Sequence, residues 1–227
     1  MKQKSTGKAL RTISKDRKRT NFLKKYEQLL IAYLVQVIPS WMSSDMLTFI
    51  GFLGNFIVFL SFIAAQYLDR WYLLAGVLGF IISWFGDSLD GRLAYYRNKP
   101  RKWYGFALDL TVDWLSTVFI GLGFMLYVDG WYYLLGYVFV VLYGWEMITT
   151  LLRYKITGNY SIDSGIFGPT EVRILISILL ILEIIIPGSI IYLSGIMIAG
   201  LFVTNIIDFV KLLQLADMRD KDEKSKR

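Results

Sequence analysis

Residues 86–114 read GDSLDGRLAYYRNKPRKWYGFALDLTVDW, and this stretch places four aspartates inside apolar segments of membrane-spanning length. The four are Asp87, Asp90, Asp109 and Asp113. An ionised carboxylate at mid-depth in a bilayer costs about 3 to over 10 kcal/mol, so four of them require compensating charge. Bound divalent cations would supply that charge with the fewest added groups.

The spacing of the aspartates places them on two helix faces. At roughly 100° per residue, Asp87 and Asp90 lie about 60° apart on one predicted helix. Asp109 and Asp113 lie about 40° apart on the next. Two adjacent helices can therefore direct all four carboxylates toward one point, which is the geometry of a site for two metal ions.

The composition of the 227-residue chain is that of a membrane protein. Hydrophobic residues make up 55% of it, aromatic residues 16%, and the mean hydropathy is +0.47. The absence of cysteine and histidine excludes disulfides, thiolate chemistry, a Ser-His triad and an ordinary zinc site. Catalysis would therefore depend on carboxylates, Lys, Arg, Tyr, Ser or Thr, or on a hard metal ion bound by oxygen.

The apolar runs predict an all-α, polytopic membrane protein with six transmembrane helices, each near the ~20 residues that cross the hydrocarbon. The expected bounds are 46–67, 71–92, 104–128, 131–153, 172–187 and 190–212. Three of the connections are very short, so the helices that they join should be antiparallel neighbours. The two longer connections, 93–103 and 154–171, carry the polar residues.

The positive charges predict the orientation in the membrane. Under the six-helix arrangement, all of the 25 Lys and Arg residues except Arg70 fall on one side. The cytoplasmic segments of membrane proteins carry the excess of Lys and Arg. Both termini and both longer connections of this integral membrane protein are therefore expected in the cytoplasm, and the four aspartates would open toward that side.

Three regions are expected along the chain. Residues 1–45 form a basic cytoplasmic arm and an N-terminal amphipathic helix that lies in the membrane interface. Residues 46–213 form the six-helix transmembrane catalytic domain, and residues 214–227 form a charged cytoplasmic tail.

The aspartates belong to a longer pattern that resembles the signature of the CDP-alcohol phosphotransferases, D-x2-D-G-x2-A-R-x8-9-G-x3-D-x3-D. Seven of its eight fixed positions match, as Asp87-x2-Asp90-Gly91-x2-Ala94-Tyr95-x9-Gly105-x3-Asp109-x3-Asp113. Tyr95 stands where the family has Arg, and Arg97 or Arg92 could supply a guanidinium for phosphate in its place. The six-helix architecture with a cytoplasmic N-terminus also agrees with the family.

The resemblance implies an enzyme of phospholipid synthesis in which an alcohol oxygen attacks the β-phosphate of a CDP-linked donor and releases CMP. It implies two Mg²⁺ or Mn²⁺ ions, held by Asp87, Asp90, Asp109 and Asp113. Asp113 would also act as general base toward the attacking hydroxyl. The expected partners are the CDP-linked donor, a lipid substrate from the bilayer and a second copy of the chain in a homodimer, with no nucleic acid.

The nucleotide of the donor is expected to contact Asp87, Gly91, Ala94, Gly105 and Thr48. Gly91 and Ala94 lack bulk, so a nucleotide could approach the helix backbone there, and Gly105 would allow close helix contact. Thr48 lies in SSDMLTFIG, residues 43–51, which resembles the family's P-N-x-L-T-x2-G entry to the first helix. Ordinary small-residue packing, and a helix cap at Thr48, are the structural alternatives.

The acceptor alcohol is less determined by the sequence. A phosphorylated acceptor would need basic residues, whereas an amino alcohol would need carboxylates or aromatic faces for its ammonium group. Trp145-Glu146 and Gly168-Pro169-Thr170-Glu171 resemble the choline/ethanolamine phosphotransferase group. We therefore predict transfer of phosphoethanolamine or phosphocholine to diacylglycerol. The candidate residues for binding the acceptor or a phosphate are Arg97, Glu146, Arg153, Glu171 and Arg173.

The sequence is also compatible with three other functions. A CDP-diacylglycerol-dependent phosphatidyltransferase would use glycerol 3-phosphate, inositol phosphate or serine, and Arg97, Arg153, Lys155 and Arg173 could hold the acceptor's phosphate. A cation transporter would bind its ion near mid-membrane, whereas these four aspartates are crowded toward one side. The chain could also be an inactive scaffold descended from such an enzyme, and the one feature that favours this alternative is Tyr95 in place of the family's Arg. The motif gives no role to Glu183 or Asp208, and either residue could face a subunit interface.

Overall fold

The computed structural model describes residues 24–158 and 169–225, and most of these residues lie in helices. The helices are α2 (Lys24–Val37), α3 (Ser44–Tyr67), α4 (Leu73–Tyr96), α5 (Lys102–Tyr127), α6 (Tyr133–Thr157), α7 (Pro169–Ile185) and α8 (Ser189–Ser225). Two short 3₁₀ turns, η1 (Arg70–Tyr72) and η2 (Gly130–Tyr132), precede α4 and α6. No strand occurs in the described ranges, so the all-α prediction is confirmed.

Five helical segments are long and apolar enough to cross a membrane. They are Ser44–Tyr67, Arg70–Tyr96, Lys102–Tyr127, Gly130–Thr157 and Ser189–Ser225. The other predicted span corresponds to α7, which has 17 residues. At 1.5 Å per residue it rises about 25 Å, slightly less than the ~30 Å hydrocarbon core. The polytopic prediction is therefore confirmed, and the count of six spans holds approximately.

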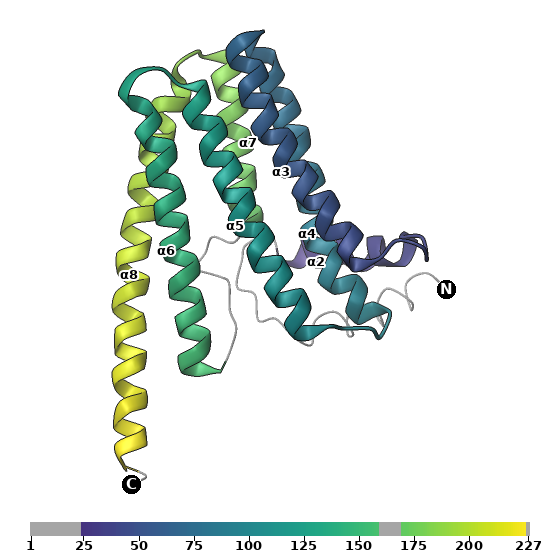
Figure 1. Cartoon of the computed structure of the whole chain (residues 1–227), viewed down its shortest axis with the longest axis vertical. Coiled ribbons are helices and arrows are strands. Elements are labelled where there is room, and N and C mark those ends of the chain that lie inside the picture. Colours follow the sequence, from purple (N-terminus) through teal and green to yellow (C-terminus); the bar gives the residue numbers. More distant parts are fainter. Residues whose placement is uncertain (1–23, 159–168, 226–227) are drawn as a thin grey trace.

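The six long helices form a closed ring. Each helix contacts the next one around the ring, in the order α3, α4, α7, α8, α6, α5, and α5 in turn contacts α3. Figure 1 shows α6 and α8 side by side on one flank and α3 with α4 on the other. The connection from α4 to α5, the end of α6 and the C-terminus lie at the same end of the ring (Figure 1).

α8 differs from the predicted last helix in its length. It continues to Ser225, past the expected end at 212, and projects beyond the other helices as the yellow ribbon in Figure 1. The predicted charged tail is therefore helical as far as it is described. Alternating basic and acidic residues support this extension, because Lys221 pairs with Asp217 four positions earlier at 2.7 Å.

α2 corresponds to the predicted N-terminal amphipathic helix, and it lies across the ends of α3 and α4 rather than along them (Figure 1). Its apolar face is buried in a cluster with residues of α3 and α4. The buried members of that cluster are Ile31, Ala32, Val35, Leu47, Leu89 and Leu93. The basic arm that precedes α2 lies outside the described residues.

Glycines bring α3 and α4 into backbone contact. A Cβ atom built on Gly54 would lie 2.6 Å from the carbonyl oxygen of Gly79, and one built on Gly51 would lie 3.1 Å from the backbone nitrogen of Asp87. Small residues allow membrane helices to approach this closely. The contact therefore fixes the aspartate-bearing turn of α4 against α3.

Glu183, unassigned from the sequence, joins α5, α7 and α8. It is buried, and its carboxylate accepts hydrogen bonds from the Tyr127 hydroxyl at 3.0 Å, the Gly188 nitrogen at 3.0 Å and the Ile190 nitrogen at 2.9 Å. The first N–H groups of a helix lack intrahelical partners. Glu183 therefore satisfies donors at the start of α8 of the same chain.

We expect Glu183→Ala to lower the free energy of unfolding by about 3 kcal/mol, because one buried and two half-buried donors lose their partner. Thermal unfolding of the detergent-purified protein would measure the loss as a lower Tm. Glu223→Ala is the matched control, because Glu223 is 58% exposed and pairs only with Arg219 in the described part of the chain. An unchanged Tm for Glu183→Ala would contradict this role.

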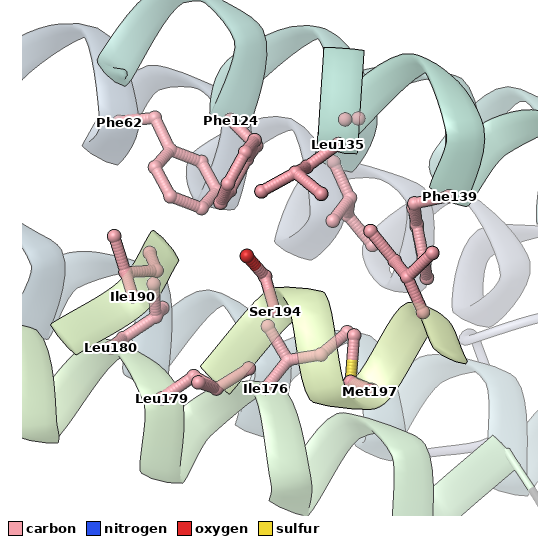
Figure 2. Close-up of a pocket in the computed structure, with 14 residues that line it drawn as sticks. Phe62, Phe124, Leu135, Phe139, Ile176, Leu179, Leu180, Ile190, Ser194 and Met197 are labelled. Atoms are coloured by element: carbon pink, nitrogen blue, oxygen red, sulfur yellow. The ribbon is translucent and has the colours of Figure 1, made fainter. Parts of the chain in front are cut away.

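A largely apolar pocket lies among α3, α5, α6, α7 and α8 (Figure 2). Phe62, Phe124 and Phe139 line one part of it, and Leu180 lines another. Ser194 of α8 points its hydroxyl into the gap between them (Figure 2), and that hydroxyl donates to the Ile191 carbonyl at 3.0 Å. The lining residues include no charged side chain, so phosphate or metal chemistry has to be placed elsewhere.

Candidate active site

The four aspartates singled out from the sequence line one pocket. One carboxylate oxygen from each of Asp87, Asp109 and Asp113 lies within 4.8 Å of the other two. Asp90 lines the same pocket beside this closest group. The other lining residues are Thr48, Gly51, Phe52, Asn55, Val112 and Arg173.

The ends of two consecutive helices position these carboxylates. Asp87 and Asp90 lie in the last turns of α4, which ends at Tyr96, and Asp109 and Asp113 follow the start of α5 at Lys102. Because α4 and α5 are antiparallel and joined by a short connection, the two pairs lie at similar depth. The pocket is therefore close to the end of the ring where α2 lies and α7 begins.

Thr48 holds Asp90 from α3. Its hydroxyl donates to Oδ2 of Asp90 at 2.6 Å, and the backbone N–H of Gly91 also donates to that carboxylate. The N-cap of α3 is Ser43, whose hydroxyl accepts from the Met46 nitrogen at 3.2 Å. The helix-cap alternative for Thr48 is therefore wrong, and Thr48 belongs to the aspartate pocket.

Arg173 of α7 supplies positive charge to the pocket. Its guanidinium lies 2.7 Å from Oδ2 of Asp87, with side-chain exposures of 14% and 26% for the two residues. Among the described lining residues, Arg173 is the single cationic side chain against four carboxylates. The pocket thus has an excess of negative charge, and the three closest carboxylates are oxygen donors of the kind that hard divalent cations prefer.

Gly91, Ala94 and Gly105 are not among the residues that line the aspartate pocket. Gly91 and Gly105 are exposed, and no described atom lies within 4 Å of a Cβ built on either one. The expectation that Gly105 permits close helix contact is therefore wrong, because no described helix approaches its Cβ position. Ala94 is half-buried near the end of α4.

Two of the predicted phosphate-binding arginines are engaged away from the pocket. Arg97 donates to the backbone carbonyls of Met42, Pro39 at 2.8 Å and Ile38 at 3.3 Å, and so holds the connection between α2 and α3. Arg153 of α6 pairs with Asp208 of α8 at 3.5 Å.

Glu146 and Glu171 are also not among the residues that line the aspartate pocket. Glu146 is half-buried on α6. Glu171 is half-buried in the first turn of α7, two positions before Arg173. Gly168, which begins the Gly168–Glu171 motif, lies outside the described residues.

Sequence reasoning missed several residues of the pocket. Asn55 is buried and lines it from α3, with its amide nitrogen 3.4 Å from the Gly51 carbonyl. A polar side chain within the apolar run 46–67 is uncommon in a transmembrane helix and marks functional positions, so Asn55 could have been found. Phe52 and Val112 carry no such signal.

Comparison with known proteins agrees with this geometry. A family described as CDP-alcohol phosphatidyltransferase matches residues 41–206, a span that contains the entire aspartate pocket. The chain is also similar to cholinephosphotransferase 1 of Danio rerio, with 33% identity over 96 residues. That alignment covers 40% of this chain and 25% of the relative, so the similarity concerns only part of each protein.

Proposed function

This chain belongs to the CDP-alcohol phosphatidyltransferase family, and we propose that it transfers a substituted phosphate group from a CDP-linked donor to an alcohol, with release of CMP. In this reaction the alcohol oxygen forms a bond to the β-phosphorus, and the bond between that phosphorus and the oxygen bridging to CMP breaks. The observation that carries the proposal is the convergence of four carboxylates from α4 and α5 on one pocket. The proposed pathway is phospholipid synthesis.

We propose that Asp87, Asp109 and Asp113 hold two Mg²⁺ or Mn²⁺ ions together with Asp90. Their oxygen donors and close spacing fit hard divalent cations, and the pocket has more negative charge than Arg173 offsets. When bound, the ions would offset the charge of the diphosphate and stabilise the in-line transition state. A cation transporter would also need carboxylates, but the family match gives that alternative no support.

Asp113 is the proposed general base. It lies one turn after Asp109 on the same face of α5, so an acceptor hydroxyl near the donor's β-phosphate could pass its proton to this carboxylate. Arg173, paired with Asp87 at 2.7 Å, is suited to contact the oxygens of the diphosphate. Thr48 keeps Asp90 oriented through its hydrogen bond of 2.6 Å.

The proposed transferred group is phosphocholine or phosphoethanolamine, and the proposed acceptor is diacylglycerol from the bilayer. A phosphorylated acceptor would need basic residues around the pocket. Arg97 is bound to backbone carbonyls and Arg153 to Asp208, which leaves Arg173 as the predicted arginine in the lining. The partial similarity to a cholinephosphotransferase supports the same choice, and Glu146 and Glu171 are the proposed carboxylates for the ammonium group.

The proposed orientation has both termini and the aspartate pocket on the cytoplasmic side. The pocket lies near the end of the ring that carries the predicted excess of Lys and Arg. A soluble CDP-linked donor would enter from that side, and the lipid acceptor would enter from the membrane. A homodimer is proposed from the family alone.

Release of CMP by the detergent-purified protein with Mg²⁺ or Mn²⁺ tests the proposed function. We expect CMP to appear with CDP-choline or CDP-ethanolamine when diacylglycerol is present, and to require the divalent ion. CDP-diacylglycerol offered with glycerol 3-phosphate, inositol phosphate or serine should give little CMP. CMP release only when CDP-diacylglycerol is the donor would instead identify a phosphatidyltransferase. No CMP release with any donor would contradict the proposed enzymatic function.

A further inference from the structure

One buried carboxylate connects α2 to the helices that form the aspartate pocket. Glu27 is 6% exposed, although it belongs to a helix whose other face is open. Its Oε1 accepts a hydrogen bond from the indole nitrogen of Trp84 in α4 at 3.2 Å. The same oxygen accepts from the hydroxyl of Thr170 in α7 at 2.9 Å. Three helices, far apart in the chain, therefore meet at one oxygen atom.

Both donors to Glu27 lie one helical turn from a residue of the pocket. Trp84 precedes Asp87 by three positions in α4, and Thr170 precedes Arg173 by three positions in α7. Residues with this spacing lie on the same side of a helix. Asp87 and Arg173 join the same two helices directly, at 2.7 Å. The contact through Glu27 and the ion pair are thus two successive links between α4 and α7.

The Glu27 hydrogen bonds and the Asp87–Arg173 ion pair act on the first turn of α7. α7 begins at Pro169, and Thr170 is its second residue. A first turn makes few intrahelical hydrogen bonds, so side-chain contacts largely determine where it lies. Losing the contact to Glu27 would therefore let the turn shift, and Arg173 would shift with it.

We propose that Glu27 is a positioning residue for the active site, which sets the place of the Arg173 guanidinium relative to Asp87. The proposal rests on the proposed function in one respect, because it treats the pocket as the site of divalent ions and of an anionic donor. Moving Arg173 away removes positive charge from the pocket. A divalent cation should then bind more tightly and the anionic donor more weakly. A general loss of folding would weaken both.

Thr170→Val and Thr170→Ser form a matched pair for the test, because valine keeps the volume and serine keeps the hydroxyl. We expect Thr170→Val to tighten Mn²⁺ binding by about threefold and to raise the KM for the CDP-linked donor by about tenfold, the scale of one lost hydrogen bond. Thr170→Ser should stay near wild type. Electron paramagnetic resonance of Mn²⁺ added to the purified full chain gives the affinity.

Gln36→Ala is the control within α2, since the Gln36 amide donates to the Ala32 carbonyl of its own helix at 2.5 Å. It should change neither quantity. An Arg173→Gln background should abolish the effect of Thr170→Val, because Glu27 acts through that arginine. Equal Mn²⁺ affinities for Thr170→Val and Thr170→Ser, or a Thr170→Val effect that persists beside Arg173→Gln, would overturn the proposal. If no donor is turned over, the proposed function fails, while the Mn²⁺ titrations still decide the role of Glu27.

Discussion

Asp113→Asn is expected to lower the rate of CMP release by about a thousandfold or more. Asparagine preserves the size of the side chain but has no negative charge and cannot take up the proton of an attacking hydroxyl. A positioned general base contributes about 10²–10⁴ in rate, and the loss of a metal ligand would add to that effect. Initial rates of CMP release at saturating donor and diacylglycerol would measure the change in kcat.

Asp129→Asn makes the same chemical change at the opposite end of the ring. Asp129 is exposed in the turn between α5 and α6, where its nearest described partner is Gln66 at 3.5 Å, so this variant should keep its activity. Mn²⁺ binding separates the two roles of Asp113. Bound Mn²⁺ with lost turnover indicates a base, and loss of both indicates a ligand. Activity within tenfold of wild type would contradict both roles.

The parts of this molecule that follow local rules could be predicted from the sequence. Apolar runs of membrane-spanning length predicted the long helices, because hydrophobic length alone decides whether a helix can cross the bilayer. The three- and four-residue spacing of the aspartates predicted that each pair shares a helix face. Those two rules predicted that Asp87, Asp109 and Asp113 lie close together, as they do in the structure.

Contacts between distant segments could not be predicted in the same way. Arg173 and Asp87 are 86 positions apart, and Thr48 and Asp90 are 42 apart. Whether they meet depends on how the helix faces pack. For Thr48 and Asp90, the close backbone contact of α3 with α4 at Gly54 contributes to that packing. The sequence singled out Arg173 only as one of several basic residues.

Arg97 shows why proximity to a motif is a weak guide to function. It lies two positions after Tyr95, where the family has its arginine, and the sequence therefore suggested a replacement for that guanidinium. The carbonyls of Pro39 and Met42, from a connection whose path no local rule specifies, occupy it instead. A buried Glu183 was likewise unassigned because its partners come from three different helices or turns.

Gly91→Leu is expected to lower kcat/KM for the CDP-linked donor by about a hundredfold, or about 2.7 kcal/mol, without harming the fold. Gly91 follows Asp90 in α4, and a Cβ built on it meets no described atom within 4 Å. Leucine is a better helix former than glycine, so Tm should stay the same or rise. The proposed nucleotide would approach α4 through this open space, and a leucine side chain would fill it. Steady-state kinetics and thermal unfolding of the same preparation measure both effects.

Two other glycines separate ligand space from packing space. Gly195 of α8 also has no described atom within 4 Å of its built Cβ, so Gly195→Leu should leave Tm and kcat/KM close to wild type. Gly54→Ala should lower Tm, because its Cβ would lie 2.6 Å from the Gly79 carbonyl oxygen. Of these three glycine variants, Gly91→Leu alone is expected to combine a preserved Tm with a lowered kcat/KM under the proposed function. Wild-type kcat/KM in that variant would mean that the nucleotide does not approach α4 at Gly91, and that solvent or lipid occupies the space there instead.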